Sequence, residues 1–224
     1  MSVPMSQVLT TARTYLNDDN ATQFPDPVLI PKVQEAHREL QTELWNVGSP
    51  LVRGVSTALS LLTGIKLLNA TSTPALPADL LCPTLLFESA ASSGPFMPMT
   101  EVFYIPLGLT PGTTMGYWSW QQEQIALVGA AGTVFIVVQY RRLITVPVLS
   151  TDLIGVLFGE SYLAPRTAAL AAGSVGNKDA MMAMTDLAQQ NLSKVISNNR
   201  GQQRPLMGPG GATGWPNLGG GRDK

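Results

Sequence analysis

The side chains with the greatest chemical reactivity are few, and they lie far apart in the sequence. The 224 residues include one cysteine, Cys82, and one histidine, His37. A disulfide or a multi-histidine metal site therefore cannot form within the chain. Cys82 has no acid, base or second thiol nearby in sequence, so we expect an inert buried thiol. His37 stands beside the apolar stripe of its predicted helix, so we expect it at the surface.

Other catalytic patterns are equally weak, and by elimination we expect that the chain is not an enzyme and needs no cofactor. The serines in "LFGES" and "FESAASSG" lie near glutamates, but a Ser–His mechanism would have to use His37. The sequence contains no glycine-rich phosphate loop with a following lysine and no G-x-S-x-G elbow. Fifteen acidic residues could meet in space, yet nothing singles out a pair. Asp18, Asp19 and Asn20 lack the continued spacing of a calcium loop, and a solvated turn is the better interpretation.

A tryptophan pair in "YWSW" is the clearest aromatic feature. Trp118 and Trp120 are two residues apart, so both would lie on one face of a strand. This spacing favours core packing or a protein interface, where tryptophan is enriched. Stacking on a sugar or a base is the alternative. A carbohydrate-binding module using Trp118 and Trp120 ranks last, because the sequence identifies no polar partners for a sugar.

Both ends of the chain carry helical patterns. Residues 4–17 alternate as an amphipathic helix, and "PDPVLIPKVQEAHRELQTELWNVGSP" predicts a longer one. We expect Asp26 to cap this second helix, with Pro27 at its first position. Its apolar residues recur at steps of three and four, as an apolar stripe requires: Leu29, Val33, Ala36, Leu40 and Leu44.

Two more helices are expected after residue 148. The first runs from about Glu160 to Gly173, and Asn177 is placed to cap the second. In this last helix an apolar stripe is expected, for which core packing is favoured over an adaptable methionine-rich surface: Met181, Met184, Ala188, Leu192 and Val195.

The central part of the chain, from about 51 to 148, has a different character. Seven short apolar or alternating runs separated by turn residues predict an antiparallel β region: "LVRGVSTALSL", "GIKLLNA", "TLLFESA", "MTEVFYI", "YWSW", "QIALVGA" and "TVFIVVQYRRL". "TPALPADLLCP" reads as a link too interrupted by proline for a central strand.

One apolar run, Ile125 to Val138, could be mistaken for a membrane anchor. Its 14 uncharged residues would span only about 21 Å as a helix, short of the bilayer core. "GAAG" at 129–132 is a turn signal, so the run is expected to form a hairpin of two strands. The consecutive β-formers Val134 to Val138 predict one face packed within the subunit and the other covered by a second layer or a neighbouring subunit. Arg141 and Arg142 would follow as a polar rim.

The composition limits the classes of partner. Charged residues make up 13% of the chain and the formal net charge is −1, so binding of nucleic acid through phosphate neutralisation is not expected. A surface with so little charge suits a protein that is largely covered by neighbouring subunits.

The last residues, 201–224, are rich in glycine and proline. A flexible tail and an arm that docks into a neighbour both agree with this composition. Docking would explain the apolar residues that a pure linker does not need: Leu206, Met207, Trp215 and Leu218.

The order of these segments resembles the head–tail connector adaptor proteins of bacteriophages, which form a ring below the portal. The resemblance starts at residues 12–44 with a short helix, an "LND" turn, an aromatic–Asp–x–x–Leu helix start and "VQEAHREL". It continues in "LPADLLCPTLLFE", "FMPMTEV" and "GYWSWQQEQIALVGA", and ends in "APRTAALAAG" and a last helix with an extended tail. Each motif is structural and loose, so the specificity lies in their order.

The resemblance implies an α+β fold, with an α-helical bundle, an inserted antiparallel β domain and an extended C-terminal arm. The bundle would be built from 1–50 and 149–200, with the β domain at 51–148 and the arm at 201–224. Such a protein forms a ring, expected to hold twelve copies, in the neck of a virion made in the host cytoplasm. Its partners would be the portal protein above, a neck or tail protein below, and identical subunits beside it. No membrane is implied, and DNA would pass through the lumen without sequence-specific binding.

In that family the C-terminal arm reaches along the portal, which makes Arg204, Leu206, Met207 and Trp215 candidate anchors. The end of this chain departs from the family, because it is rich in glycine and only weakly basic. The arm's docking partner is therefore left open. Another neck or tail protein, such as a stopper or a tail terminator, is the alternative, and such rings are commonly sixfold.

Overall fold

Helix α2 (Asp26–Asn46) follows closely from its sequence pattern. All five residues of the predicted stripe, from Leu29 to Leu44, are fully buried in the computed structural model, which describes residues 3–105 and 109–201. The predicted cap is wrong, because Pro25 is the N-cap and Asp26 already lies in the first turn. The side chain of Asp26 instead forms an ion pair with Arg13 of helix α1 (Met5–Leu16), which draws it away from the backbone of its own helix.

His37 is buried, so the expectation of a surface histidine is wrong. Helix α2 packs against helix α3 (Glu160–Ser174), and its buried face is wider than the stripe, taking in His37 and Gln41 as well. His37 is 0% exposed, and neither ring nitrogen has a hydrogen-bond partner in the described structure. Burial, together with the nearby Arg38 charge, lowers the pKa of His37 to about 4, so this side chain is neutral at pH 7.

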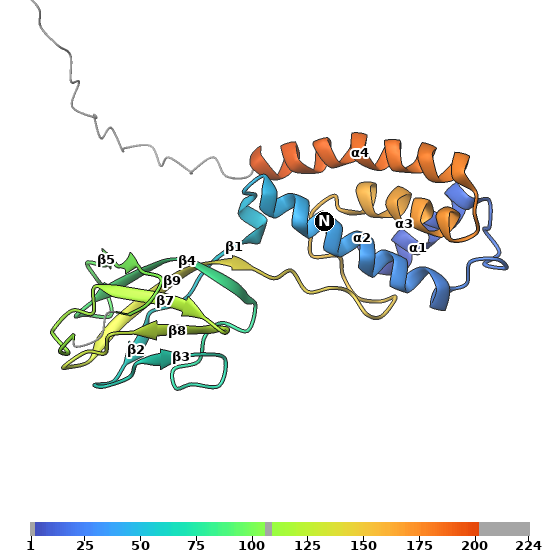
Figure 1. Cartoon of the computed structure of the whole chain (residues 1–224). Coiled ribbons are helices and arrows are strands. Elements are labelled where there is room, and N and C mark those ends of the chain that lie inside the picture. The colour runs from blue at the N-terminus through green and yellow to red at the C-terminus, as the bar shows by residue number, and fades with distance from the viewer. Residues whose placement is uncertain (1–2, 106–108, 202–224) are drawn as a thin grey trace, which may run out of the picture.

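Helix α4 (Lys178–Gly201) packs along α3, and α1 also contacts α3. Helices from both ends of the described chain therefore share one hydrophobic core, with the strands gathered to one side (Figure 1). Asn177 caps α4 as predicted, because its Oδ1 accepts the Ala180 N–H at 3.1 Å. The predicted stripe holds for its last three members, but Met184 is half-buried and Met181 is 37% exposed because it lies in the helix's first turns.

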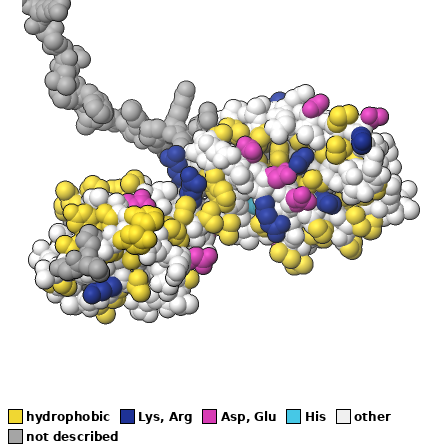
Figure 2. All heavy atoms as spheres, in the orientation of Figure 1, with side chains coloured by type: hydrophobic (Ala, Val, Ile, Leu, Met, Phe, Trp, Pro, Cys, Tyr) yellow, Lys and Arg dark blue, Asp and Glu magenta, His cyan; other side chains and the backbone are white. Residues whose placement is uncertain are grey.

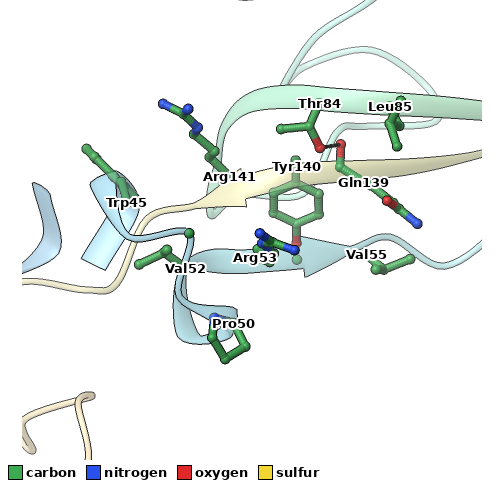
Figure 3. A pocket seen from close by; sticks show the side chains of 12 residues that line it. Trp45, Pro50, Val52, Arg53, Val55, Thr84, Leu85, Gln139, Tyr140 and Arg141 are labelled. Carbon is green, nitrogen blue, oxygen red and sulfur yellow. Dashed lines mark hydrogen bonds between the residues drawn. The ribbon is translucent and has the colours of Figure 1, made fainter. Parts of the chain in front are cut away.

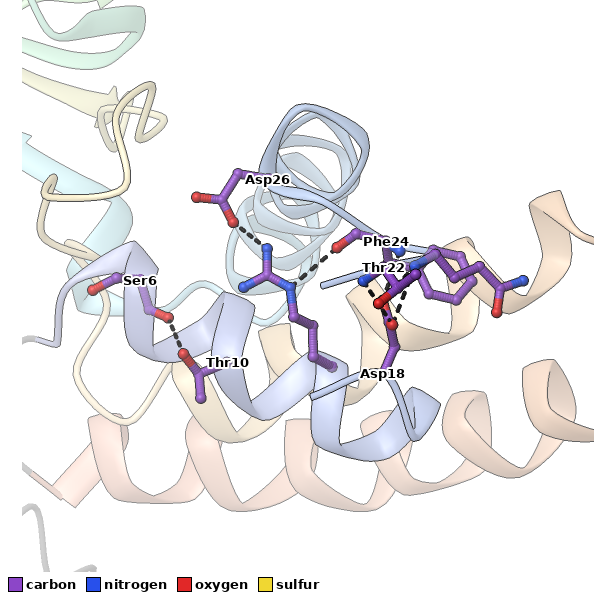
Figure 4. Close-up of polar contacts among 8 residues, drawn as sticks. Ser6, Thr10, Asp18, Thr22, Phe24 and Asp26 are labelled. Carbon is purple, nitrogen blue, oxygen red and sulfur yellow. Dashed lines mark hydrogen bonds and ion pairs between the residues drawn. The ribbon is translucent and has the colours of Figure 1, made fainter. Parts of the chain in front are cut away.

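In the α1–α2 loop, Asp19 and Asn20 are exposed in a turn as predicted, but Asp18 is a buried carboxylate. Asp18 is 8% exposed and accepts backbone N–H groups from Thr22 (2.9 Å), Gln23 (3.1 Å) and Phe24 (2.6 Å) (Figure 4). Burial alone would raise the pKa of Asp18, but these three hydrogen bonds and the Arg13 charge outweigh it and the pKa is lowered. The expectation failed for Asp18 alone, because the loop turns Phe24 into the core and the backbone N–H groups on its way need an acceptor.

Two sheets form the rest of the described fold. One contains strand β9 at its centre, in the order β1-β9-β4-β5 with β2 also paired to β9, and the other has the order β3-β8-β7-β6. Buried residues from both sheets make a second hydrophobic core. Most pairs are antiparallel as predicted, but β6 and β7 are parallel. The strands are β1 (Arg53–Val55), β2 (Leu59–Leu61), β3 (Leu67–Leu68), β4 (Leu80–Ser89), β5 (Met97–Pro98), β6 (Thr100–Glu101), β7 (Tyr117–Gln121), β8 (Gln124–Leu127) and β9 (Val134–Arg142).

The predicted hairpin between 125 and 142 is wrong, although both strands exist. Strand β8 pairs with β3 and β7, whereas β9 pairs with β1, β2 and β4 in the other sheet. The "GAAG" segment therefore carries the chain from one sheet to the other. The two strands therefore lie in facing sheets, and their apolar faces enter the same core from opposite sides.

The proline-bracketed segment is also different from expectation, because Leu80 to Pro83 begin strand β4. Pro83 pairs with Tyr140 of β9, and irregularities in the register flank it on both sides. Strand β5 pairs with β4 only at Phe87 and Glu88, so the Pro83 end of β4 has β9 on one side and no strand on the other. A proline is tolerated there because the missing N–H would face an unpaired edge. Cys82, expected to be buried, is partly exposed at this edge.

In the part of the chain that the structure describes, no helix is long and apolar enough to cross a membrane.

Candidate interaction surface

The outer face of the β9 sheet carries apolar side chains that no other part of the described chain fully covers. Along β9, Val134, Ile136 and Val138 point into the core and are at most 3% exposed, whereas Phe135 and Val137 are half-buried. This confirms the prediction that one side of the run packs within the subunit. The register assigns the residues of the opposite side, here called the outer face: Val55, Leu85, Phe87, Pro98, Phe135 and Val137.

The outer face is open enough to take part in binding. Val55 is 64% exposed and Leu85 is 48% exposed, and they lie on strands that flank β9. Gln139 of β9 pairs with both and lies between them on the same face. Exposed apolar side chains gathered on one face and bordered by polar residues are typical of interaction sites. Cover of this face by a second layer or by a neighbouring subunit stays a prediction.

A pocket of about 580 Å³ adjoins the outer face where the helices meet the strands (Figure 3). Its walls come from the end of α2, the 3-10 turn Pro50–Val52, and strands β1, β4 and β9. Trp45 fixes one wall, because its indole N–H donates to the Arg142 carbonyl at 3.4 Å. In another wall of the pocket the residue at position 54 must be glycine, because a Cβ there would overlap the ring of Tyr140.

Tyr140 is held rigidly between the pocket and the core. Its hydroxyl donates to Asp79 at 2.9 Å, and Asp79 in turn pairs with Arg142 at 2.9 Å. Burial, with the hydrogen bond to Asp79 and the charge of that carboxylate, raises the pKa of Tyr140 to about 12. The phenol is therefore a neutral donor, not a catalytic base, at physiological pH.

Two arginines at the pocket occupy opposite positions on neighbouring strands, and their side chains point in different directions (Figure 3). Arg53 of β1 and Arg141 of β9 are directly paired across the strands, and both are exposed. In the described part of the chain neither forms an ion pair. Like charges in this position destabilise a sheet. Figure 2 shows Lys and Arg side chains gathered where the helices and strands meet, so an acidic group of a partner would be favoured there.

A second apolar surface lies on the loop before α3. Val148, Leu149 and Leu153 are each 61–62% exposed, and the loop that presents them is ordered by Asp152. The Asp152 carboxylate accepts the backbone N–H groups of Val148 and Leu149, both at 2.8 Å, which lowers its pKa although burial opposes this. The chain therefore holds three large aliphatic side chains in water on a defined turn, here called the aliphatic loop.

The tryptophan pair is split between two environments. Trp118 is 1% exposed and belongs to the core between the sheets, which fits the packing interpretation and leaves it no face for a ligand. Trp120 is half-buried and lines a separate pocket near the β7–β8 turn. The remaining predicted interface residues lie outside the described residues: Arg204, Leu206, Met207, Trp215 and Leu218.

Sequence reasoning missed the arginine pair and the aliphatic loop. Arg141 was expected in a polar rim after the strand, but β9 extends to Arg142, which brings Arg141 opposite Arg53. The "VLSTDL" segment at 148–153 carried a usable signal, because three aliphatic residues around one aspartate are more than a plain connection needs.

Among the described residues there is no group of three or more His, Cys, Asp or Glu side chains that could hold a metal ion.

The chain matches no known family model. A comparison with curated proteins also finds no match.

Proposed function

We propose that the chain is a structural subunit of a bacteriophage head–tail connector, an adaptor that forms a ring between the portal and the neck or tail. The observation that carries the proposal is the exposure of large apolar side chains on ordered elements. The outer face and the aliphatic loop together place Val55, Leu85, Leu149 and Leu153 in water at 48–64% exposure. Covering each of them would contribute about 1–2 kcal/mol to association.

The arrangement of the chain agrees with this role. Helices α1 and α2 precede the strands and α3 and α4 follow them, yet all four contribute to one core. In the proposal these helices are the bundle of the adaptor, the two sheets are its inserted domain, and the segment predicted at 201–224 is the arm. A ring subunit needs a rigid body for lateral contacts, and the Arg166–Glu39 ion pair between α2 and α3, at 2.6 and 2.8 Å, adds to that rigidity.

The charge agrees with a channel that lets DNA pass. A net charge of −1 gives little attraction for a phosphate backbone, so DNA could move through a lumen without being held. The arginine pair at Arg53 and Arg141 would then be neutralised by acidic groups of a neighbouring subunit or of the portal.

The test is co-expression with the portal protein of the same particle, followed by negative-stain imaging. We expect a portal carrying a second ring of twelve subunits. A sixfold ring would assign the chain to a stopper or a tail terminator. Monomers that never join the portal would refute the assembly role altogether.

A matched pair of variants locates the contact. Leu149→Glu combined with Leu153→Glu should abolish ring formation, because two carboxylates would be buried in an apolar contact. Gln190→Glu adds a charge at an exposed position of α4, a helix that belongs to neither apolar surface, and should assemble normally. Circular dichroism must show that both variants are folded. If the double variant forms normal rings, the aliphatic loop is not part of the interface.

A further inference from the structure

A second pocket, of about 400 Å³, lies beside the turn between β7 and β8. Trp120 at the end of β7 is half-buried in its wall, so part of its ring is available to a ligand. Leu76, Leu80 and Leu81 add apolar surface, and a loop around Asn69 closes another side. This volume is in the range of sites that take small organic ligands.

The pocket has hydrogen-bonding groups that the chain itself leaves unused. The Asn69 Oδ1 accepts from the Thr71 backbone N–H (2.9 Å) and hydroxyl (3.0 Å), which orients the amide and leaves its Nδ2 donors without a partner in the described structure. The side chains of Gln122, Glu123 and Gln124 line the pocket and form no hydrogen bond with other described residues. Donors and acceptors are therefore mixed around the tryptophan, as hydroxyl groups require, since each hydroxyl both donates and accepts.

The turn that carries two of these residues is strained. Gln122 and Glu123 have φ values of 50° and 61°, in the left-handed region where glycine and asparagine are preferred. A non-glycine residue costs about 1 kcal/mol or more in this conformation. Folding alone would be served better by Asn-Gly, so long polar side chains at both positions point to a use beyond the turn.

The charge of the pocket selects the ligand class. Its lining contains the Glu123 carboxylate and no lysine or arginine. Phosphate groups would be repelled, which disfavours a nucleotide or a nucleic acid. A partly exposed tryptophan face, a rim of amides and one carboxylate suit the C–H face and the hydroxyl groups of a sugar ring.

We propose that this pocket binds a neutral oligosaccharide, with one pyranose ring stacked on Trp120 and its hydroxyl groups bound by Asn69, Gln122, Glu123 and Gln124. The site stands independently of the ring assembly, because it uses neither the outer face nor the aliphatic loop. It also differs from a module built on both tryptophans, since Trp118 is buried.

The test follows the indole N–H signal of Trp120 by NMR in the full chain. The chain has four tryptophans, so the signal is assigned by its absence from the Trp120→Phe spectrum. Maltotriose, cellotriose and chitotriose are titrated separately to about 20 mM, because a site of this size and openness is expected to bind in the millimolar range. At least one trisaccharide should shift the Trp120 signal saturably.

Four variants separate binding from folding. Trp120→Ala should weaken binding at least tenfold. Trp120→Phe keeps an aromatic ring in the pocket wall, so its affinity should remain within about fivefold of the parent's. Because this variant lacks the indole signal, its binding is followed by backbone amide shifts. Tyr117→Ala removes an exposed aromatic ring from the same strand, outside the pocket, and should bind normally. The double variant Gln122→Asn, Glu123→Gly should melt at a higher temperature because the turn strain is relieved, and should still lose most binding.

Several results would overturn the proposal. These are no saturable shift with any of the three sugars, equal binding by Trp120→Ala, or unchanged affinity in the Asn-Gly turn variant. A hexathymidine oligonucleotide and a proline-rich peptide are titrated in parallel. Tighter binding of either than of the trisaccharides would reassign the pocket to that ligand class and refute the sugar proposal.

Discussion

Acidification should destabilise the helical part of the protein through one residue, His37. This histidine is the only one in the chain, it is fully buried, and its ring nitrogens have no hydrogen-bond partner in the described structure. Neither nitrogen has a hydrogen-bond acceptor in the described structure, so a proton added to the ring would be buried without a partner. The pKa of His37 is therefore lowered, by burial first and by the Arg38 charge second, from 6.5 to about 4.

The direction and size of the effect follow from these two pKa values. Between pH 6.5 and pH 4 the unfolded chain binds a proton at His37 and the folded chain does not, so the free energy of unfolding falls as the pH falls. The loss is about 2 kcal/mol at pH 5 and approaches about 3 kcal/mol below pH 4. A domain with a total stability of about 5–15 kcal/mol would show this plainly.

The assay is urea unfolding at pH 7, 6, 5 and 4, followed by circular dichroism at 222 nm, where the helices dominate the signal. The matched variant is His37→Leu, which keeps an apolar side chain of similar size in the core. At pH 7 it should be about as stable as the parent or more so, because two unpaired buried nitrogens are removed. Carboxylates titrate in both proteins, so the difference between parent and variant isolates His37.

Equal pH dependence in the two proteins would refute the reasoning. So would an imidazole NMR signal that titrates near 6.5 in the folded parent, since that value belongs to a solvated ring. Either result would mean that His37 is in contact with water, as its position in the sequence predicted.

Three further substitutions test other parts of the fold by urea unfolding. Asp18→Asn should lower the urea midpoint of unfolding at pH 7, because an amide cannot replace a carboxylate that accepts three backbone N–H groups. The difference in midpoint between parent and variant should narrow as the pH falls through the lowered pKa of Asp18, where the parent's carboxylate becomes protonated. An unchanged midpoint at pH 7 would contradict this. Gly54→Ala should cost about 1–3 kcal/mol, because its Cβ would overlap the Tyr140 ring, and a neutral effect would show that the ring can move. Arg166→Lys should cost about 0.5–1 kcal/mol through loss of the paired hydrogen bonds to Glu39, whereas full stability in the lysine variant would mean that the ion pair contributes nothing.

The parts of the fold that were predictable depend on local patterns. The stripe of α2 and the Asn177 cap were predicted correctly, because helix periodicity and capping act within a few residues. The positions of most strands were predictable for the same reason. The failures concern distant contacts: His37 is buried in the packing of α2 against other elements, among them α3, and no pattern within α2 contains that information.

Strand pairing shows the same limit. Alternation and turn signals placed strands at 124–128 and 133–140, close to the observed β8 and β9, but both a hairpin and a crossing between sheets satisfy those signals. The choice depends on which partners bury more apolar surface, and β9 gains pairs with β1, β2 and β4 by leaving β8. The candidate surfaces were less predictable still, because exposure of Val55 or Leu149 is a property of the folded chain rather than of the local sequence.

The apolar run in β9 connects these observations to assembly. Val134, Ile136 and Val138 are accounted for by the core between the two sheets. Phe135 and Val137 are not needed there, and polar residues at these positions would make the monomer more soluble. Their retention beside the exposed Val55 and Leu85 is explained if a neighbouring subunit covers the outer face. The unpaired Arg53 and Arg141 at its edge would then orient that neighbour, because only a partner that brings an acidic group relieves their repulsion.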